Sequence, residues 1–165
     1  MRTPGWDGAS CDYVRHMFSA GLVPYRFSRD LEIMIAHPGG PLWARKDAGS
    51  WSIVKGRIED DEDARAAAGR EFSEETGWPV PDGHWLDLGE IYQRSGKRVV
   101  AWAVDAPHLD PRKLDPGHFE MRWRGKMRSF PEIDRVRWVN RSEAQLLMMP
   151  AQLPFFDRLA EQMEP

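Results

Sequence analysis

The stretch 56–78, GRIEDDEDARAAAGREFSEETGW, limits the fold of this chain more than any other segment. Residues 63–76 are predicted to form a helix, because acidic residues precede a run of alanines and Gly77 supplies a C-terminal stop. At helical spacing three glutamates share one face of this helix: Glu71, Glu74 and Glu75. Like charges at this spacing repel one another, so the sequence predicts that something compensates them.

Small residues on the same side of the predicted helix point to a metal as the compensating charge. Ala64, Ala67 and Ala68 come one to two turns before the glutamates and would let the helix sit close to a sheet, with the carboxylates turned partly inward. Mg²⁺ takes oxygen ligands and often bridges to substrate phosphates. Arg70 is placed to orient a carboxylate, and Gly56 offers a carbonyl free of side-chain obstruction. The alternative is a solvated acidic face, against which the alanines count.

The same stretch resembles the Nudix box, the signature of the Nudix hydrolase family. The matching pattern is Gly56, five residues, Glu62, seven residues, Arg70-Glu71-Phe72, one residue, Glu74-Glu75, one residue, Gly77 and Trp78. Every charged position and both glycines are present, and only Trp78 departs from the family's usual aliphatic residue. The resemblance implies a Nudix-type α/β/α sandwich with a central mixed β-sheet over residues 17–165.

The resemblance also implies roles for individual residues. Glu74 and Glu75 would be the principal Mg²⁺ ligands, with Mn²⁺ as a substitute, and Glu71 would be a further ligand or the general base. Arg70 would orient the glutamates, and Glu62 would brace the turn before the helix; a favourable charge near a helix N-terminus is the alternative for Glu62. The implied reaction is attack of metal-activated water on phosphorus, with a carboxylate accepting the proton and a mononucleotide among the products.

Further candidate site residues lie outside the box. Lys55, directly before Gly56, is a candidate phosphate contact, with a solvated lysine as the equal alternative. The family often adds an acidic ligand from later strands or loops. Glu132 is preferred for that role and Glu120 is second, a surface carboxylate being the alternative for either.

The predicted substrate is a small-molecule nucleotide. Lys55-Gly56, Gly96-Lys97 and Tyr92 resemble features of the dinucleoside polyphosphate and NTP pyrophosphohydrolase branches. Trp43, Trp51 and Tyr92 are candidates to stack a base, with core packing as the alternative. Other substrates stay open: ADP-ribose-like sugars, damaged dNTPs or a capped RNA 5′ end. A non-catalytic nucleotide-sensing or protein-binding domain is also open, although the intact glutamates argue against it.

Net charge bears on the RNA alternative. The formal net charge of -3 provides no global positive field, so nucleic acid is a disfavoured partner unless a local patch forms. The candidates for such a patch are Arg122, Arg124, Lys126 and Arg128, interleaved with Trp123 and Phe130. A mobile charged loop is the alternative reading of this segment.

The rest of the chain predicts one domain of strands and helices. Its 165 residues, 41% hydrophobic and 30% charged, suit a single soluble core. Strands are expected at 18–26, 31–37, 51–54, 85–93, 98–105, 119–123 and 136–139. Further helices are expected at 142–149, capped by Ser142, and at 155–163, and a loop is expected at 106–118.

The N-terminal segment and the cysteine count bear on location. Residues 1–16 predict a tail, with Met17 as a candidate natural start. They lack the apolar stretch of a signal peptide, and no apolar run in the chain reaches membrane-spanning length. The single Cys11 cannot form an internal disulfide. Together these features predict a cytoplasmic protein that is not in a membrane.

Overall fold

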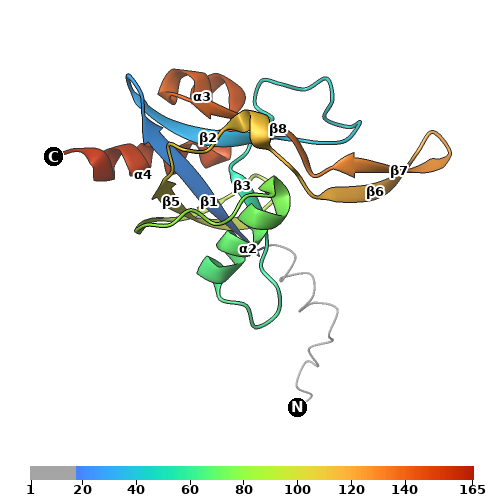
Figure 1. The fold of residues 1–165 in the computed structure, drawn as a ribbon, viewed down its shortest axis with the longest axis horizontal. Helices are drawn as coiled ribbons and strands as arrows, with labels where there is room; N and C mark the ends of the chain where they lie inside the picture. Colours follow the sequence, from blue (N-terminus) through green and yellow to red (C-terminus); the bar gives the residue numbers. More distant parts are fainter. Residues whose placement is uncertain (1–17) are drawn as a thin grey trace, which may run out of the picture.

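A mixed six-stranded sheet forms the centre of the computed structural model, which describes residues 18–165 (Figure 1). The strand order is β4-β5-β1-β2-β8, with β3 paired to β1. The strands are β1 (Phe18–Phe27), β2 (Leu31–Pro38), β3 (Val54–Arg57), β4 (Trp85–Tyr92), β5 (Arg98–Asp105) and β8 (Ile133–Val139). The helices are α2 (Ala64–Thr76), α3 (Arg141–Leu147) and α4 (Leu153–Met163), with short 3₁₀ turns η1 (Pro111–Lys113) and η2 (Pro150–Gln152). The predicted tail, Cys11 and Met17 lie outside the described residues.

Strand β1 organises the sheet because it pairs with three neighbours. It runs parallel to β5 and antiparallel to both β2 and β3. Its first half pairs with β3, as at Leu22 opposite Val54, and its second half pairs with β2, as at Tyr25 opposite Ile33. Helix α2 packs across β1 and β3. Strand β3, which precedes α2 in the sequence, therefore lies beside the glutamate-bearing helix.

Hydrophobic residues cover both faces of the sheet. One cluster joins the sheet to α3 and α4 and includes Val23, Ile33, Phe155, Phe156 and Leu159. The other joins the opposite face to α2 and includes Leu22, Met34, Phe72 and Val104. Because successive strand residues point to opposite faces, β1 buries neighbours such as Leu22 and Val23 on different sides. This double burial explains the nearly continuous apolar character of β1 and gives the predicted layered sandwich. No helix within residues 18–165 is long and apolar enough to cross a membrane.

Sequence predictions of element boundaries are wrong at several points, including the start of β8 at Ile133 rather than at 136 and the end of α3 at Leu147 rather than at 149. Strand β3 begins at Val54 rather than at Trp51, because Trp51 and the next residue form only isolated bridges. Ser142 is not the cap of α3. Asn140 takes that role, accepting a 3.0 Å hydrogen bond from the Glu143 amide while the Glu143 carboxylate accepts one of 3.0 Å from the Asn140 amide. This reciprocal capping box satisfies two amides and starts the helix at Arg141.

The cationic segment, for which a mobile charged loop is the alternative prediction, forms a hairpin that contains the strand predicted at 119–123. β6 (His118–Trp123) and β7 (Lys126–Pro131) form a separate two-stranded sheet. The turn between them is Arg124-Gly125, with φ values of 50° and 79°, as in the type I′ turns that join tight hairpins. The expected loop at 106–118 is interrupted by η1, and its last residue already belongs to β6.

A buried histidine ties the loop after β2 to β8. The His37 side chain is fully buried, and its Nδ1 lies 2.8 Å from Asp134 Oδ1. Its Nε2 donates to the carbonyl oxygen of Lys46 at 2.6 Å, and its ring meets Trp51 edge-on. These contacts satisfy a buried polar side chain and hold the loop in place.

His37→Ala is therefore expected to lower the free energy of unfolding by about 3 kcal/mol, since it opens a cavity and removes two hydrogen bonds. Urea unfolding measures the change, with the exposed His84→Ala as the matched control, expected to change little. Equal effects of the two substitutions would show that the buried contacts do not stabilise the loop.

Candidate active site

Helix α2 carries most of the candidate site. Asp63 caps it by accepting a 3.1 Å hydrogen bond from a backbone amide of the first turn. The helix ends at Gly77, whose φ of 73° lies in the left-handed region that glycine favours. Ala67 and Ala68 are fully buried against Ala20 of β1. The small residues thus let the helix lie close to the sheet, so its glutamates are presented at the sheet surface rather than in open solvent.

The glutamates of α2 open into a pocket of about 410 Å³, here called the carboxylate pocket. Its lining includes Gly56, Glu71, Glu74, Glu75, His118 and Glu132. The Glu71 side chain is 14% exposed and that of Glu74 is 59% exposed. Glu71 therefore lies close to the sheet and Glu74 close to solvent. The structure therefore brings the three helical glutamates together with Gly56 and with Glu132 from a distant segment.

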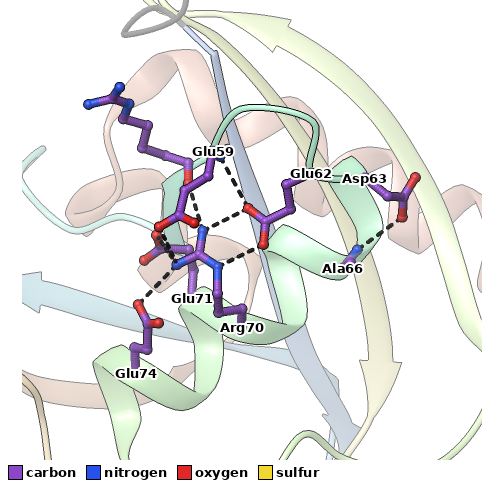
Figure 2. A network of polar contacts seen from close by, with 8 residues as sticks. Glu59, Glu62, Asp63, Ala66, Arg70, Glu71 and Glu74 are labelled. Atoms are coloured by element: carbon purple, nitrogen blue, oxygen red, sulfur yellow. Dashed lines mark hydrogen bonds and ion pairs between the residues drawn. The ribbon is translucent and has the colours of Figure 1, made fainter.

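Arg70 is the centre of a network of charged hydrogen bonds (Figure 2). Its Nε and Nη2 donate to the two carboxylate oxygens of Glu62 at 2.7 and 2.8 Å. Its Nη1 donates to Glu71 and Glu74, both at 3.0 Å, and its Nη2 also reaches the carbonyl oxygen of Arg57. One guanidinium thus links the segment before α2 to two of the glutamates and fixes their orientation.

Glu62 sits in the turn before α2 and is held from two sides. Both of its carboxylate oxygens accept hydrogen bonds from Arg70, and one of them also accepts a 3.1 Å hydrogen bond from the Glu59 amide. The Arg70 hydrogen bond holds the pKa of Glu62 below its usual range, and the same bond raises the pKa of Arg70. Both groups are therefore charged at neutral pH, and the pair braces the turn as the sequence predicts for these residues.

Gly56 lies against the Glu71 carboxylate. A Cβ added at Gly56 would come within 2.0 Å of the Glu71 carboxyl group, so no other residue fits without moving that side chain. Burial raises the pKa of Glu71, although Arg70 opposes the effect. The absence of a side chain at Gly56 therefore leaves space for the Glu71 carboxylate, whose pKa is raised by burial.

Lys55 and Glu75 meet in a second pocket of about 270 Å³, here called the lysine pocket. Trp43, Gln93 and Glu132 also line it. Burial, followed by repulsion from Glu71, raises the pKa of Glu75 to about 8. Burial, followed by repulsion from Lys97, lowers the pKa of Lys55 to about 8. Because Glu75 and Glu132 line both pockets, the lysine pocket adjoins the carboxylate pocket.

The structure distinguishes between the two acidic candidates that lie outside α2. Glu132 follows β7, lines both pockets and contributes to the raised pKa values of Glu71 and Glu75. Glu120 is exposed on β6 opposite Ser129 and lines neither pocket. Only Glu132 lies with the helical carboxylates.

The aromatic candidates for base stacking have different surroundings. Trp43 lines the lysine pocket and remains available to a ligand. Tyr92 is 63% exposed near the end of β4, and its neighbour Gln93, rather than Tyr92 itself, lines the lysine pocket. Trp51 is 3% exposed and belongs to the core, where its indole donates a hydrogen bond to Asp47. The prediction that Trp51 could stack a base is therefore wrong, and the alternative of core packing is confirmed.

Sequence reasoning missed His118 and Gln93, which line the carboxylate and lysine pockets respectively. Neither has a local signal in the sequence. Gln93 merely follows a strand, and His118 begins β6 at the end of a segment that the sequence predicts as a loop. Only their packing beside α2 and β3 in the folded chain identifies them.

The donor chemistry of the carboxylate pocket fits a hard divalent cation. Its acidic side chains supply oxygen donors, and burial together with repulsion among the carboxylates raises the pKa values of Glu71 and Glu75. No group of three or more His, Cys, Asp or Glu side chains in residues 18–165 is arranged so that it could hold a metal ion by itself. Mg²⁺ does not need such a group, because it is commonly held by one or two carboxylates together with waters and substrate phosphates.

The raised pKa of Glu75 predicts a pH-dependent stability in metal-free buffer. The folded protein holds the Glu75 proton up to about pH 8, whereas the unfolded chain releases it near 4.5. Stability from this group is therefore present below pH 4.5 and is lost as the pH rises towards 8. Glu75→Gln removes the loss, so in EDTA the variant is expected to gain about 3.5 kcal/mol over the wild type between pH 5 and pH 8. Urea unfolding at both pH values measures this gain, and an unchanged difference between the proteins would contradict it.

Comparisons with known proteins agree with this geometry. A family model described as the NUDIX domain matches residues 16–159. An RNA pyrophosphohydrolase of Acidiphilium cryptum (strain JF-5) is 30% identical over 168 residues, covering 87% of this chain and 93% of the relative. A binary complex of a C. elegans Ap4A hydrolase has a TM-score of 0.65 at 18% identity, covering 88% of this chain and 97% of that chain. The NUDIX domain of Shewanella oneidensis NrtR complexed with ADP ribose has a TM-score of 0.60 at 13% identity, covering 89% and 88%.

The solved structures confirm the predicted α/β fold with its mixed central sheet. The family model spans the sheet, the glutamate helix and both pockets. The chain therefore belongs to the Nudix family of pyrophosphohydrolases.

Proposed function

We propose that this protein uses Mg²⁺, with Mn²⁺ as a substitute, to cleave a pyrophosphate bond in dinucleoside polyphosphates or NTPs. The observation that carries the proposal is that the carboxylate pocket adjoins the lysine pocket, since Glu75 and Glu132 line both. A polyphosphate chain lying across them would meet metal-binding oxygens on one side and the Lys55 ammonium on the other. An anionic substrate needs such local positive charge, because the chain as a whole carries -3.

The residues of the two pockets divide the work. Glu74 and Glu75 are the principal metal ligands in this proposal, with Glu132 as the ligand from outside the helix and the Gly56 carbonyl beside them. Bound Mg²⁺ would neutralise phosphate oxygens and lower the pKa of a water molecule. Arg70 holds Glu71 and Glu74 in a fixed orientation through 3.0 Å hydrogen bonds, and Glu62 anchors Arg70 in turn.

Proton transfer and substrate binding fall to other groups. Glu71 is the candidate general base, because its raised pKa makes it a better proton acceptor than an ordinary glutamate. Lys55 contacts phosphate in its charged form, which predominates below its pKa of about 8. Trp43 offers a ring for the base at the edge of the lysine pocket, and Tyr92 is the outlying second candidate.

The relatives support two substrate classes within this proposal. The likeness to an Ap4A hydrolase structure favours dinucleoside polyphosphates. The relative that is an RNA pyrophosphohydrolase favours a 5′-phosphorylated RNA end as the second candidate. A specific feature of the structure, the cationic β6–β7 hairpin, also favours the second candidate.

A substrate panel tests the proposal. Purified protein is incubated with Mg²⁺ or Mn²⁺ and Ap4A, Ap3A, ATP, GTP, ADP-ribose, an oxidised dNTP or a 5′-triphosphorylated RNA, and the products are separated by chromatography. Metal-dependent release of a mononucleotide from Ap4A, Ap3A or an NTP is the expected result. Turnover confined to ADP-ribose or the oxidised dNTP would replace the proposed substrate class. No turnover of any compound would favour a non-catalytic binding domain.

A further inference from the structure

The β6–β7 hairpin, residues 118–131, begins and ends at the candidate site. It forms a sheet of its own and extends away from the main sheet (Figure 1). The Gly117 amide donates to the Glu74 carbonyl oxygen at 3.1 Å, and the Glu132 amide donates to the Gly117 carbonyl oxygen at 2.7 Å. The hairpin is therefore anchored at the C-terminal half of α2, beside the carboxylate pocket.

The inner half of the hairpin is packed against the loop after β2. The rings of Phe119 and Phe130 lie 6.0 Å apart, and a Cβ at Gly40 would meet Phe119 at 2.9 Å. A Cβ at Gly39 would overlap the Pro131 carbonyl oxygen at 1.8 Å. These close contacts hold the base of the hairpin firmly on the body of the protein.

The outer half carries positive charge that the rest of the described chain does not neutralise. Its four cations are all exposed: Arg122, Arg124, Lys126 and Arg128. None of them makes an ion pair with any residue from 18 to 165, whereas cations elsewhere, such as Arg70 and Arg141, are paired. Residues 118–131 contain one carboxylate, Glu120, so this hairpin is locally cationic in a chain of net charge -3.

The tip of the hairpin keeps a cation at an unfavourable position. Arg124 adopts a φ of 50° in the type I′ turn, where glycine or asparagine is favoured. The local cost of this conformation is not offset by any hydrogen bond or ion pair of its side chain with residues 18–165. An arginine here is better explained by what its charge binds than by the stability of the turn.

One face of the hairpin combines two of these cations, Lys126 and Arg128, with an aromatic ring. Register pairs place Trp123 opposite Lys126 and Met121 opposite Arg128, on the same face as Phe119. Aromatic rings that stack bases, alternating with cations that contact phosphates, are the usual components of a surface for single-stranded nucleic acid. An acidic protein would need only the cations, so the interleaved Trp123 favours a nucleic-acid strand.

The length of the hairpin sets the size of its ligand. The six residues of β7 extend roughly 20 Å at about 3.3 Å per residue. A mononucleotide bound at the carboxylates would not reach the tip, whereas a strand of several nucleotides would follow the hairpin outwards. We propose that the outer half of the β6–β7 hairpin binds single-stranded RNA near its 5′ end, holding that end at the carboxylate pocket. This surface is additional to the proposed site of nucleotide hydrolysis.

Binding of a 12-nucleotide RNA that cannot be hydrolysed tests the proposal. The RNA has a 5′-hydroxyl and a 3′ fluorescent label, so anisotropy reports binding without catalysis. With three phosphate contacts, from Arg124, Lys126 and Arg128, the slope of log K against log salt is expected to be about -2 for the wild type. The double substitution Lys126→Gln with Arg128→Gln is expected to reduce the slope by about 1.4 and to lower affinity at least tenfold at low salt.

Further variants separate charge, stacking and folding. The control Arg29→Gln with Lys113→Gln removes the same charge from exposed positions outside the hairpin and should keep the wild-type slope. Trp123→Ala should lower affinity at least fivefold with the slope unchanged. Arg124→Gly suits the turn and preserves folding, yet it should reduce the slope by about 0.7.

Two results would overturn the proposal: wild-type binding no tighter than that of the hairpin double variant, or an equal loss in the control. Wild-type turnover of the nucleotide panel is measured separately. A failed RNA-binding result with normal nucleotide turnover would reject the hairpin surface alone, and the reverse result would reject only the proposed hydrolysis.

Discussion

Glu75→Gln is expected to lower kcat for nucleotide hydrolysis in saturating Mg²⁺ on the order of 10³-fold. The Glu75 carboxylate lies where the carboxylate pocket meets the lysine pocket, and burial already raises its pKa to about 8. A buried carboxylate that is repelled by Glu71 binds a divalent cation well, because the positive charge of the cation offsets that repulsion. The amide keeps the shape of the side chain but carries no charge, so metal affinity and rate should fall together.

Steady-state rates measured over a Mg²⁺ titration test this expectation. Glu120→Gln is the matched control, because Glu120 is exposed on β6 and lines neither pocket. It should retain at least half of the wild-type kcat. A Glu75→Gln enzyme within threefold of the wild type at all Mg²⁺ concentrations would remove Glu75 from the list of metal ligands.

Arg70→Ala is expected to lower the free energy of unfolding by about 2 kcal/mol and to reduce kcat at least 100-fold. Arg70 is 25% exposed and binds Glu62, Glu71 and Glu74, so its loss leaves three carboxylates without their shared partner. Partial exposure keeps the stability loss below that of a fully buried ion pair. The rate falls because Glu71 and Glu74 are no longer held in a fixed orientation.

Two comparisons make the Arg70 result specific. Arg70→Lys keeps the charge but cannot form the two-pronged contact with Glu62, so its losses should be intermediate. Arg112→Ala breaks an ion pair with Asp110 in which the arginine is 89% exposed, and it should leave the free energy of unfolding close to that of the wild type. Urea unfolding and kcat are measured for all three, and an Arg70→Ala variant as stable and active as Arg112→Ala would contradict the bracing role.

The local parts of the fold were predictable from sequence because their signals are local. Helix α2 has an aspartate cap, a run of alanines and a terminal glycine, and it forms within a residue of the predicted bounds. Strand β5 matches its prediction at both ends because its apolar run is bounded by charged residues. Strand β7 was missed because only half of its six residues are apolar and its turn begins with Arg124 rather than asparagine or glycine.

The candidate site divides in the same way. The glutamates of α2 follow from helical spacing within one short segment. Their meeting with Glu132 depends on how the β6–β7 hairpin returns to α2, which no local pattern encodes. Trp51 could not be separated from a surface tryptophan by sequence, because its burial depends on contacts with α3 and α4 far along the chain. The same holds for His37, whose partner Asp134 is 97 residues away.

The dependence of wild-type turnover on Mg²⁺, measured after complete removal of metal with EDTA, tests the central claim most directly. The assay follows mononucleotide release from Ap4A and ATP as Mg²⁺ is returned, with Glu75→Gln and Glu120→Gln in parallel. We expect no turnover without metal, full recovery for the wild type and Glu120→Gln, and a rate about 10³-fold lower for Glu75→Gln. Turnover that persists in EDTA, or that returns equally in all three proteins, would contradict a metal-dependent carboxylate site at α2.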